Sequence, residues 1–314
     1  MIVTVASGKG GTGKTTVAVG LTLSLTADDR TSTDHPLLSC HPLFLDCDVE
    51  EPNAALFLRP TIEERREVGQ MVPEVDLNKC TYCGRCAGVC QYHAIAVVGK
   101  KVLVFPELCH GCGSCALNCP TQAIREVLHV TGTIERGRAI LPPASGGQGG
   151  VEFAQGTMNV GEPMAVPIIR QLKRWVIAPA SGMSHPGERP VILDASPGTA
   201  CPVVEAMRGA DFVLMVTEPT PFGLHDLRLA VEVARDELGL PVGVVVNRDG
   251  VGDRGVDAYC AAEGIPILMH IPLERRIAEA YSDGISLVQA LPEYCQQFLN
   301  LYMAIEKQAA GTKE

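Results

Sequence analysis

The segment from Ile2 to Thr16 constrains the fold more than any other part of the chain. It reads Ile-Val-Thr-Val-Ala-Ser-Gly-Lys-Gly-Gly-Thr-Gly-Lys-Thr-Thr, so a β-branched run leads into a glycine-rich turn. The apolar-periodic segment that follows, 17–25, predicts a helix. A strand, a glycine loop and a helix in this order favour a phosphate-binding loop, because backbone N–H groups at the start of a helix surround anions.

The residues of this loop have distinct predicted roles. Its glycines permit positive φ and a close approach of the backbone to phosphate. Lys14 would neutralise β- and γ-phosphate charge, and Thr15 would offer its hydroxyl to Mg²⁺. The predicted nucleotide-binding residues of the loop are Gly8, Lys9, Gly10, Gly11, Thr12, Gly13, Lys14, Thr15 and Thr16. A glycine-rich turn without a ligand is the alternative, and the complete Gly-x4-Gly-Lys-Thr spacing argues against it.

A second lysine narrows the class of ATPase. Lys9 lies in the pattern Lys-Gly-Gly-x-Gly-Lys-Thr. On these residues the chain resembles the deviant Walker A ATPases, the superfamily that includes MinD, ParA, the nitrogenase iron protein and the Mrp-type cluster carriers. The resemblance implies ATP and Mg²⁺ as cofactors, and a dimer in which Lys9 reaches the phosphates of the partner subunit. A solvated lysine is the alternative.

Two carboxylates at the ends of apolar runs fit the same resemblance. Asp48 lies in a segment, 46–53, that resembles switch I, so it would position or activate the attacking water. Asp194 ends the run 190–194 and resembles the Walker B aspartate of the Mg²⁺ shell. The N–H of Gly198, in the switch II-like segment, would sense the γ-phosphate. The resemblance makes Lys9, Lys14 and Asp48 the predicted catalytic residues, and an ordinary loop carboxylate is the alternative for Asp48.

Two later residues complete the predicted nucleotide site. Asn247 follows the apolar run 242–246 and resembles the asparagine that reads adenine in this family. Pro272, in Ile-Pro-Leu, follows the next apolar run and is also family-like. A generic helix or turn cap is the alternative for Asn247.

Eight of the 13 cysteines form a repeated pattern. They run Cys80-x2-Cys83-x2-Cys86-x3-Cys90 and then Cys109-x2-Cys112-x2-Cys115-x3-Cys119-Pro120. This is the bacterial two-cluster ferredoxin spacing, in which three close cysteines hold one 4Fe-4S cluster and the fourth reaches the other. The predicted ligand sets are therefore Cys80, Cys83, Cys86 and Cys119 for the first cluster, and Cys109, Cys112, Cys115 and Cys90 for the second.

The two halves of this pattern are a repeat. Each cysteine of the first half recurs 29 positions later, as Cys80 does in Cys109, which predicts a duplicated unit with pseudo-twofold symmetry. Gln91 departs from the pattern, because the second half has Pro120 at that place. Two zinc sites are the alternative, although three thiolates on one tight turn suit a cubane face better.

Alternating apolar runs and helical patterns predict the fold class. The runs 212–216 and 242–246 flank an amphipathic helical stretch, which is typical of a parallel, doubly wound sheet. We expect an α/β P-loop domain of the MinD type, with a mostly parallel sheet and an inserted small α+β ferredoxin-like domain. The predicted segments are 1–71 and 128–314 for the ATPase and 72–127 for the insert. Residues 132–161 are expected to form short strands and loops.

Charge and hydropathy exclude several classes of partner. The net charge of −10 argues against nucleic-acid binding. Met1 leads directly into the first strand, which leaves no room for a signal peptide, and no apolar run of about 18 residues predicts stable membrane insertion. A cytoplasmic protein is expected. The segment 293–307 has the apolar spacing of a membrane-targeting helix, but a packed terminal helix fits its acidic charge better.

These patterns lead to three alternative functions. The first is an ATPase that couples nucleotide-dependent dimer switching to 4Fe-4S electron transfer or redox-linked complex assembly. The second is an iron-sulfur cluster carrier, and the third is a MinD- or ParA-like spatial organiser in which the clusters are structural. The expected partners are a second copy or a related ATPase subunit, together with a redox protein.

Overall fold

The computed structural model describes residues 1–26, 41–140, 150–177 and 189–311. The strands are β1 (Ile2–Ala6), β2 (Leu43–Cys47), β3 (Thr61–Val75), β4 (Ile95–Val98), β5 (Lys101–Val104), β6 (Ile124–Ile140), β7 (Gly150–Met158), β8 (Val191–Ala195), β9 (Phe212–Thr217), β10 (Val242–Asp249) and β11 (Ile267–Pro272). The α-helices are α1 (Lys14–Ser24), α2 (Ala55–Leu58), α3 (Arg85–Val89), α4 (Ser114–Leu117), α5 (Val166–Val176), α6 (Cys201–Met207), α7 (Pro221–Val231), α8 (Gly255–Glu263), α9 (Arg275–Ser282), α10 (Leu287–Ala290) and α11 (Glu293–Gly311). A 3₁₀ turn spans Pro106–Leu108, and a π-helical segment, Glu232–Glu237, continues α7.

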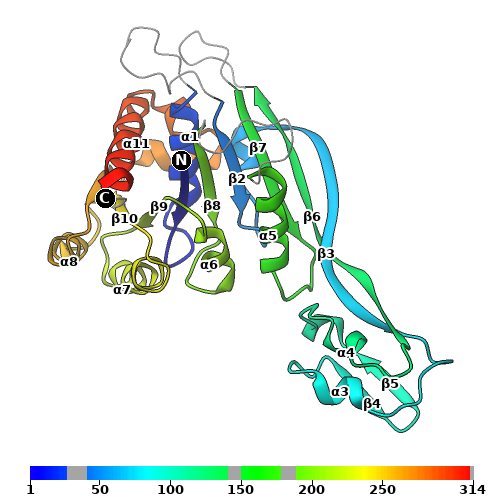
Figure 1. The fold of residues 1–314 in the computed structure, drawn as a ribbon. Helices are drawn as coiled ribbons and strands as arrows, with labels where there is room; N and C mark the ends of the chain where they lie inside the picture. The colour runs from blue at the N-terminus through cyan, green and yellow to red at the C-terminus, as the bar shows by residue number, and fades with distance from the viewer. Residues whose placement is uncertain (27–40, 141–149, 178–188, 312–314) are drawn as a thin grey trace.

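Nine strands of the described residues form one sheet, in the order β11-β10-β9-β1-β8-β2-β7-β6-β3 (Figure 1). The neighbours from β11 to β7 pair in parallel, and only β7–β6 and β6–β3 are antiparallel. The central strands are apolar runs buried on both faces, which is expected of parallel strands covered by helices. This confirms the predicted α/β fold with a mostly parallel sheet.

Two helical layers cover the two faces of this sheet. Successive side chains of β1 alternate between them, with Val3 and Val5 on one side and Ala6 on the other. The first layer contains α1, α2, α10 and α11, and the second contains α5, α6, α7 and α8. Gly20 of α1 lets α11 approach closely, because a Cβ there would lie 2.7 Å from the ring of Phe298.

The C-terminal helix α11 packs against the body of the protein. Its apolar side chains Tyr294, Phe298, Leu301, Tyr302 and Ile305 are all buried in the first helical layer. The prediction of a packed terminal helix is therefore confirmed. Within the described residues, no helix combines the length and apolarity needed to cross a membrane.

The edge of the sheet differs from the sequence-based expectation. Strands β3 and β6, of 15 and 17 residues, pair as one long antiparallel ribbon. The expectation of short strands and loops over 132–161 is wrong for β6 and β7, which are continuous up to Ile140 and from Gly150. Residues 141–149, between these two strands, lie outside the described residues. Pairing along the whole ribbon stabilises strands that carry mostly polar side chains.

The cysteine-rich segment lies at the far end of this ribbon (Figure 1). We call residues 76–123, between the end of β3 and the start of β6, the cysteine module. The Asp76 N–H donates to the carbonyl of Ala123 at 2.7 Å and closes the module at its base. The predicted segment boundaries at 71/72 and 127/128 fall inside the unbroken strands β3 and β6. The division into segments therefore stays a prediction.

Candidate functional site

The glycine loop between β1 and α1 forms one wall of a pocket of about 360 Å³. Gly13 has φ +89° and precedes the first helical residue, Lys14, so the loop turns directly into the N-terminus of α1. A Cβ at Gly13 would lie 2.2 Å from Nδ2 of Asn247, and one at Gly8 would lie 2.2 Å from the carbonyl oxygen of Asp226. Close approach therefore requires glycine at both positions, and at Gly13 the positive φ requires it as well.

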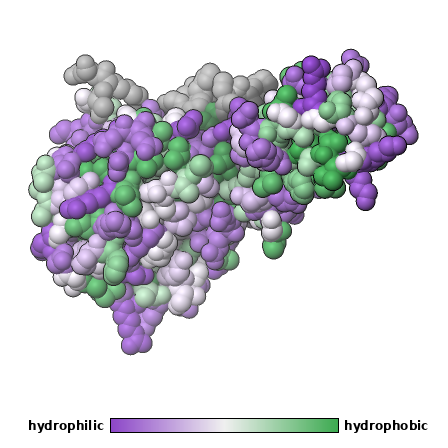
Figure 2. All heavy atoms as spheres, turned by 90° about the horizontal axis from the view of Figure 1, so that it is seen from below, coloured by the Kyte–Doolittle hydropathy of each residue, from purple (hydrophilic) through white to green (hydrophobic). Residues whose placement is uncertain are grey.

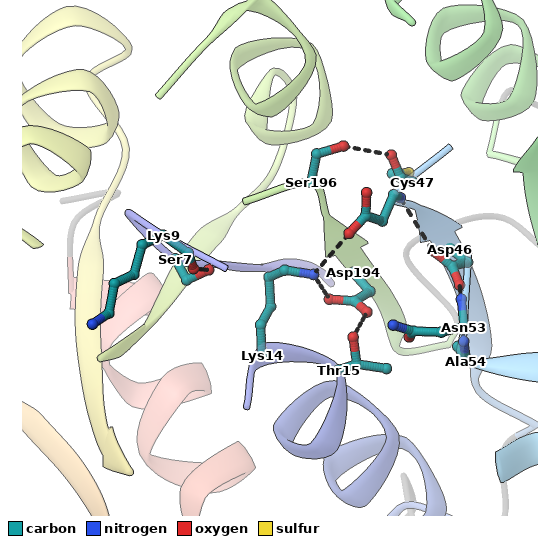
Figure 3. A network of polar contacts seen from close by, with 11 residues as sticks. Ser7, Lys9, Lys14, Thr15, Asp46, Cys47, Asn53, Ala54, Asp194 and Ser196 are labelled. Atoms are coloured by element: carbon teal, nitrogen blue, oxygen red, sulfur yellow. Dashed lines mark hydrogen bonds and ion pairs between the residues drawn. The ribbon is translucent and has the colours of Figure 1, made fainter. Parts of the chain in front are cut away.

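A network of buried charges lies at the base of this pocket (Figure 3). The Lys14 ammonium donates to Asp194 Oδ1 at 2.7 Å and lies 3.8 Å from Asp48 Oδ2. The Thr15 hydroxyl donates to the other oxygen of Asp194 at 2.6 Å. Asp194 comes from the end of β8, and Asp48 from the loop after β2, so the carboxyl ends of adjacent parallel strands bring both to the loop.

Asp46 shapes the loop that carries Asp48. Its side chain is fully buried and accepts N–H groups from Asp48, Asn53 and Ala54 at 3.0–3.1 Å. Burial, reinforced by the charge of Asp194, raises the pKa of Asp46 to about 7. The bonds to both ends of the segment 48–54 fix its path around the pocket.

The protonation of the central charges follows from burial and proximity. Burial raises the pKa of Asp48 to about 6, with Lys14 opposing the shift and Asp194 adding to it. Burial alone would lower the pKa of Lys14, but Asp194 and the neighbouring carboxylates raise it above its ordinary value. Lys14 therefore carries a positive charge beside Asp48, whose pKa is about 6. A buried cation with carboxyl groups beside it suits a site that holds phosphate and a metal ion.

Lys9 points away from Lys14 (Figure 3). Its ammonium lies 3.2 Å from Glu218 Oε2, and Arg248 donates to the other oxygen of Glu218 at 2.6 Å. Glu218 directly follows β9, which places it at the same edge of the sheet as Asp48 and Asp194. Lys9 is thus held by its own subunit in this structure.

The remaining predicted site residues are arranged around the loop. Asn247, in β10, donates from Nδ2 to the carbonyl of Thr12 at 2.7 Å. Thr12 itself is buried, and its hydroxyl is one of two buried side-chain atoms of the described residues that have no hydrogen-bond partner. The Gly198 N–H donates to the carbonyl of Ser7 at 2.9 Å. An unpartnered hydroxyl beside a glycine loop and a lysine fits a phosphate-bearing ligand.

The structure brings most of the predicted nucleotide residues to one pocket. Its lining includes Lys9, Gly10, Gly11, Thr12, Gly13, Lys14, Thr15, Thr16, Asp48, Asn247 and Pro272. Gly8 and Gly198 do not line it, and Asp194 contacts Lys14 and Thr15 from beneath. Two features of the site were not predicted from the sequence: Glu218, and the helix α9, whose Ile277, Ala278 and Tyr281 close the pocket. The position of Glu218 at the end of an apolar strand could have indicated it.

The cysteine module has a backbone that repeats at an interval of 29 residues. Gly84 and Gly113 have φ +75° and +71° and precede α3 and α4. The N–H groups of Ala94 and Ala123 donate to the sulfurs of Cys90 and Cys119 at 3.3 and 3.2 Å. The N–H groups of Tyr82 and Gly111 likewise donate to Cys80 and Cys109, at 3.4 and 3.5 Å. The same conformation thus occurs twice, as the repeat predicts.

The structure brings four cysteines of the repeat together. Cys80, Cys83, Cys86 and Cys119 line one small pocket, together with Val97 and Val102 of the hairpin β4–β5. In the second half, burial raises the pKa of the Cys109 thiol, the Gly111 N–H lowers it, and the nearby Cys112 and Cys90 raise it again. Cys90 packs against the small cluster that contains Cys109, so it lies beside the second half although it belongs to the first half in sequence.

None of the described cysteines forms a disulfide bond. Among the described residues, no three side chains of His, Cys, Asp or Glu are placed to hold a single metal ion. Of the five cysteines outside the repeat, Cys47 and Cys260 are buried, Cys295 is half-buried and Cys201 is exposed. Cys40 lies outside the described residues. Burial raises the pKa of Cys47 to about 12 and that of Cys260 to about 11, so both behave as small core side chains.

Known proteins resemble this chain in sequence or in fold. An uncharacterised protein of Methanocaldococcus jannaschii is 30% identical over 309 residues, which are 96% of this chain and 97% of that protein. An uncharacterised ferredoxin of the same organism is 43% identical over 54 residues, 16% of this chain and 70% of the ferredoxin. The structure of the septum site-determining protein MinD of Pyrococcus horikoshii, complexed with Mg-ADP, is similar in fold. It has a TM-score of 0.54 at 18% identity, over 99% of this chain and 98% of its own.

The family itself follows from a match that spans most of the chain. Residues 3–288 match the model described as the CobQ/CobB/MinD/ParA nucleotide binding domain. This range extends from β1 to α10 and contains the glycine loop, Asp48, Asp194 and Asn247. The chain therefore belongs to the CobQ/CobB/MinD/ParA family of nucleotide-binding domains.

Proposed function

We propose that this protein is an ATP-hydrolysing iron-sulfur protein, in which nucleotide-dependent dimer switching controls electron transfer by two 4Fe-4S clusters. The observation that supports this most strongly is the pocket formed by Cys80, Cys83, Cys86 and Cys119. Three of these cysteines come from one tight turn and the fourth from the other half of the repeat. This crossed arrangement is the one that two-cluster ferredoxins use.

The nucleotide half of the proposal is supported by the charges of the P-loop pocket. The glycine loop and Lys14 would hold the phosphates of ATP, and Thr15 and Asp194 would hold Mg²⁺. Asp48 lies beside Lys14 and would orient the attacking water. Bound Mg²⁺ supplies charge neutralisation at the phosphates. The pocket side chains from Pro272 and α9 would contact the base, with Asn247 reading adenine.

The proposed dimer depends on Lys9. In this structure Lys9 bonds Glu218 and points away from Lys14. In the proposed ATP-bound state Lys9 leaves Glu218 and contacts the phosphates bound by the partner, which is a second copy or a related ATPase subunit. ATP would thus order the dimer, and hydrolysis would release it.

The cluster half is supported by the hydrogen bonds to sulfur. The second ligand set would be Cys109, Cys112, Cys115 and Cys90. In each half of the repeat, N–H groups donate to the sulfurs of the first and fourth cysteines. Such bonds stabilise thiolates and raise the reduction potential of the metal they hold. A redox protein would exchange electrons with these clusters.

The proposal is tested with protein purified without oxygen. We expect about eight irons and eight sulfides per chain and Mg²⁺-dependent ATP hydrolysis. Hydrolysis should differ between oxidised and reduced clusters, and Cys83→Ala should remove this difference. Cys295→Ala, outside the repeat, is the matched control. Zinc in place of iron would refute the cluster assignment, and equal rates in all states would refute the coupling.

A further inference from the structure

We infer that α5 links the nucleotide loop to the cysteine module, with Lys173, Gln171 and Trp175 as positioning residues. This inference rests on the proposed function and names the route by which the nucleotide would reach the clusters. Four sets of contacts between the pocket and Cys109 support it.

The route begins at the loop after β8. Ser196 of this loop donates to the carbonyl of Cys47 at 3.3 Å, and Gly198 donates to that of Ser7 at 2.9 Å. The loop is therefore bonded to β2 on one side and to the glycine loop on the other. It leads directly into α6, so a rearrangement at the phosphates would displace the start of this helix.

Helix α5 is bonded to α6 by five hydrogen bonds. Arg170 makes two parallel bonds to the carboxylate of Glu205, at 3.1 and 2.9 Å. Lys173 donates to three carbonyls at the end of α6, those of Glu205, Ala206 and Arg208, at 2.6–2.9 Å. A lysine at a helix C-terminus satisfies carbonyls that have no partner within the helix. These bonds join the two helices as one unit.

The same helix holds the ribbon on its other side. The guanidinium carbons of Arg66, in β3, and Arg136, in β6, lie 4.5 and 4.9 Å from the centre of the Trp175 ring. Glu64 pairs with both arginines at 2.6 Å, which fixes them over the ring. Trp175 is the only tryptophan of the chain. Cation–π attraction therefore holds both arginines, and with them both strands of the ribbon, against α5.

The last contact reaches a predicted cluster ligand. Gln171 donates to the carbonyl of Gly69 at 2.8 Å, at the irregularity in β3 between Val68 and Gly69. The next residue, Gln70, is buried and donates to the carbonyl of Cys109 at 2.7 Å. A shift of α5 would therefore move the backbone of Cys109 through two adjacent residues.

The test uses the whole protein with its clusters and measures their midpoint potential with and without a non-hydrolysable ATP analogue and Mg²⁺. We expect the analogue to shift the potential of the wild type. Gln171→Met should lose at least half of this shift while iron content and nucleotide affinity stay unchanged. The control Gln296→Met, at an exposed position of α11, should keep it.

A second pair of variants tests the other contact. Trp175→Leu should also reduce the shift in midpoint potential. If Trp175→Leu lowers the cluster content, Arg66→Gln tests the same cation–π contact from an exposed position of β3. A full shift in both Gln171→Met and Arg66→Gln would overturn the route and leave the proposed coupling intact. No shift in the wild type would overturn the coupling and the route together.

Discussion

The nucleotide pocket and the cysteine module differ in what holds them in shape. The pocket lies against the core of a nine-stranded sheet, and its central charges Lys14, Asp46 and Asp194 are almost completely buried. At the module the buried apolar cluster is small: Ala94 and Cys109 pack with Val72 of β3, and Cys83 and Cys112 are exposed. Figure 2 shows the module as an arm that projects from the larger body. The first site is supported by a large core, whereas the module has little buried core of its own.

Removal of the proposed clusters should have the largest effect on this difference between the two sites. Metal ligation contributes much of the folding free energy of small domains, about 10 kcal/mol or more for structural zinc. Chelation of iron under mild oxidation should therefore abolish hydrogen-exchange protection in residues 76–123 and leave α1 and β8 protected. If protection of the module persisted without iron, its small core would be sufficient for folding.

Lys14→Ala should have the largest effect on the nucleotide pocket. Loss of one preorganised charge at the reacting phosphates costs about 100- to 1,000-fold in rate in comparable sites. We expect ATP hydrolysis to fall by about this factor, measured as phosphate release, with cluster content unchanged. Lys307→Ala, at an exposed position of α11, is the control. A rate within about threefold of the wild type would exclude Lys14 from phosphate binding.

Glu218→Gln should have a moderate effect on dimer formation. The change removes the charge that attracts Lys9 and Arg248, and partly exposed ion pairs of this kind are worth about 1 kcal/mol or less. The ATP-bound dimer should form at a concentration about two- to fivefold lower, measured by analytical ultracentrifugation. The control is Glu263→Gln on α8, which removes an ion pair between Glu263 and Arg235 and should leave the dimer unchanged. Weaker dimerisation of Glu218→Gln would contradict the proposed role of Lys9.

The pH dependence of stability should show the smallest effect. Burial raises the pKa of Asp48 to about 6 and that of Asp46 to about 7, above the value near 4 of an unfolded chain. Between these values the folded state binds more protons than the unfolded state, so the free energy of unfolding falls as the pH rises. The ligand-free protein should melt at a lower temperature at pH 8 than at pH 5.5. Asp48→Asn should reduce this difference and Asp283→Asn should not.

The sequence predicted the sheet and the loop well because both depend on local patterns. The glycine spacing fixes Gly13 at positive φ, and the apolar runs 212–216 and 242–246 became β9 and β10. The crossed cysteine sets also came from spacing alone, and they stay a prediction. In each case a short stretch of chain contains the information.

The ribbon and the ion pair of Lys9 could not be predicted in this way. Residues 61–67 of β3 are mostly exposed and charged, so they lack the alternation that indicates a half-buried strand. Their structure depends on pairing with β6, about 70 residues later. Glu218 meets Lys9 only because β9 and β1 are neighbours in the sheet. Contacts of this kind depend on the tertiary fold.

The length of the ribbon has a mechanical consequence. A strand of 17 residues, as in β6, extends over about 55 Å at the usual rise per residue. Trp175 and Gln171 contact the ribbon partway along, and from Gly69 to the end of β3 about 20 Å remains. If the ribbon tilted by a few degrees where Trp175 and Gln171 contact it, the end of β3 would move by about 1–2 Å. The arm would thus act as a lever that amplifies a small rotation at its pivot.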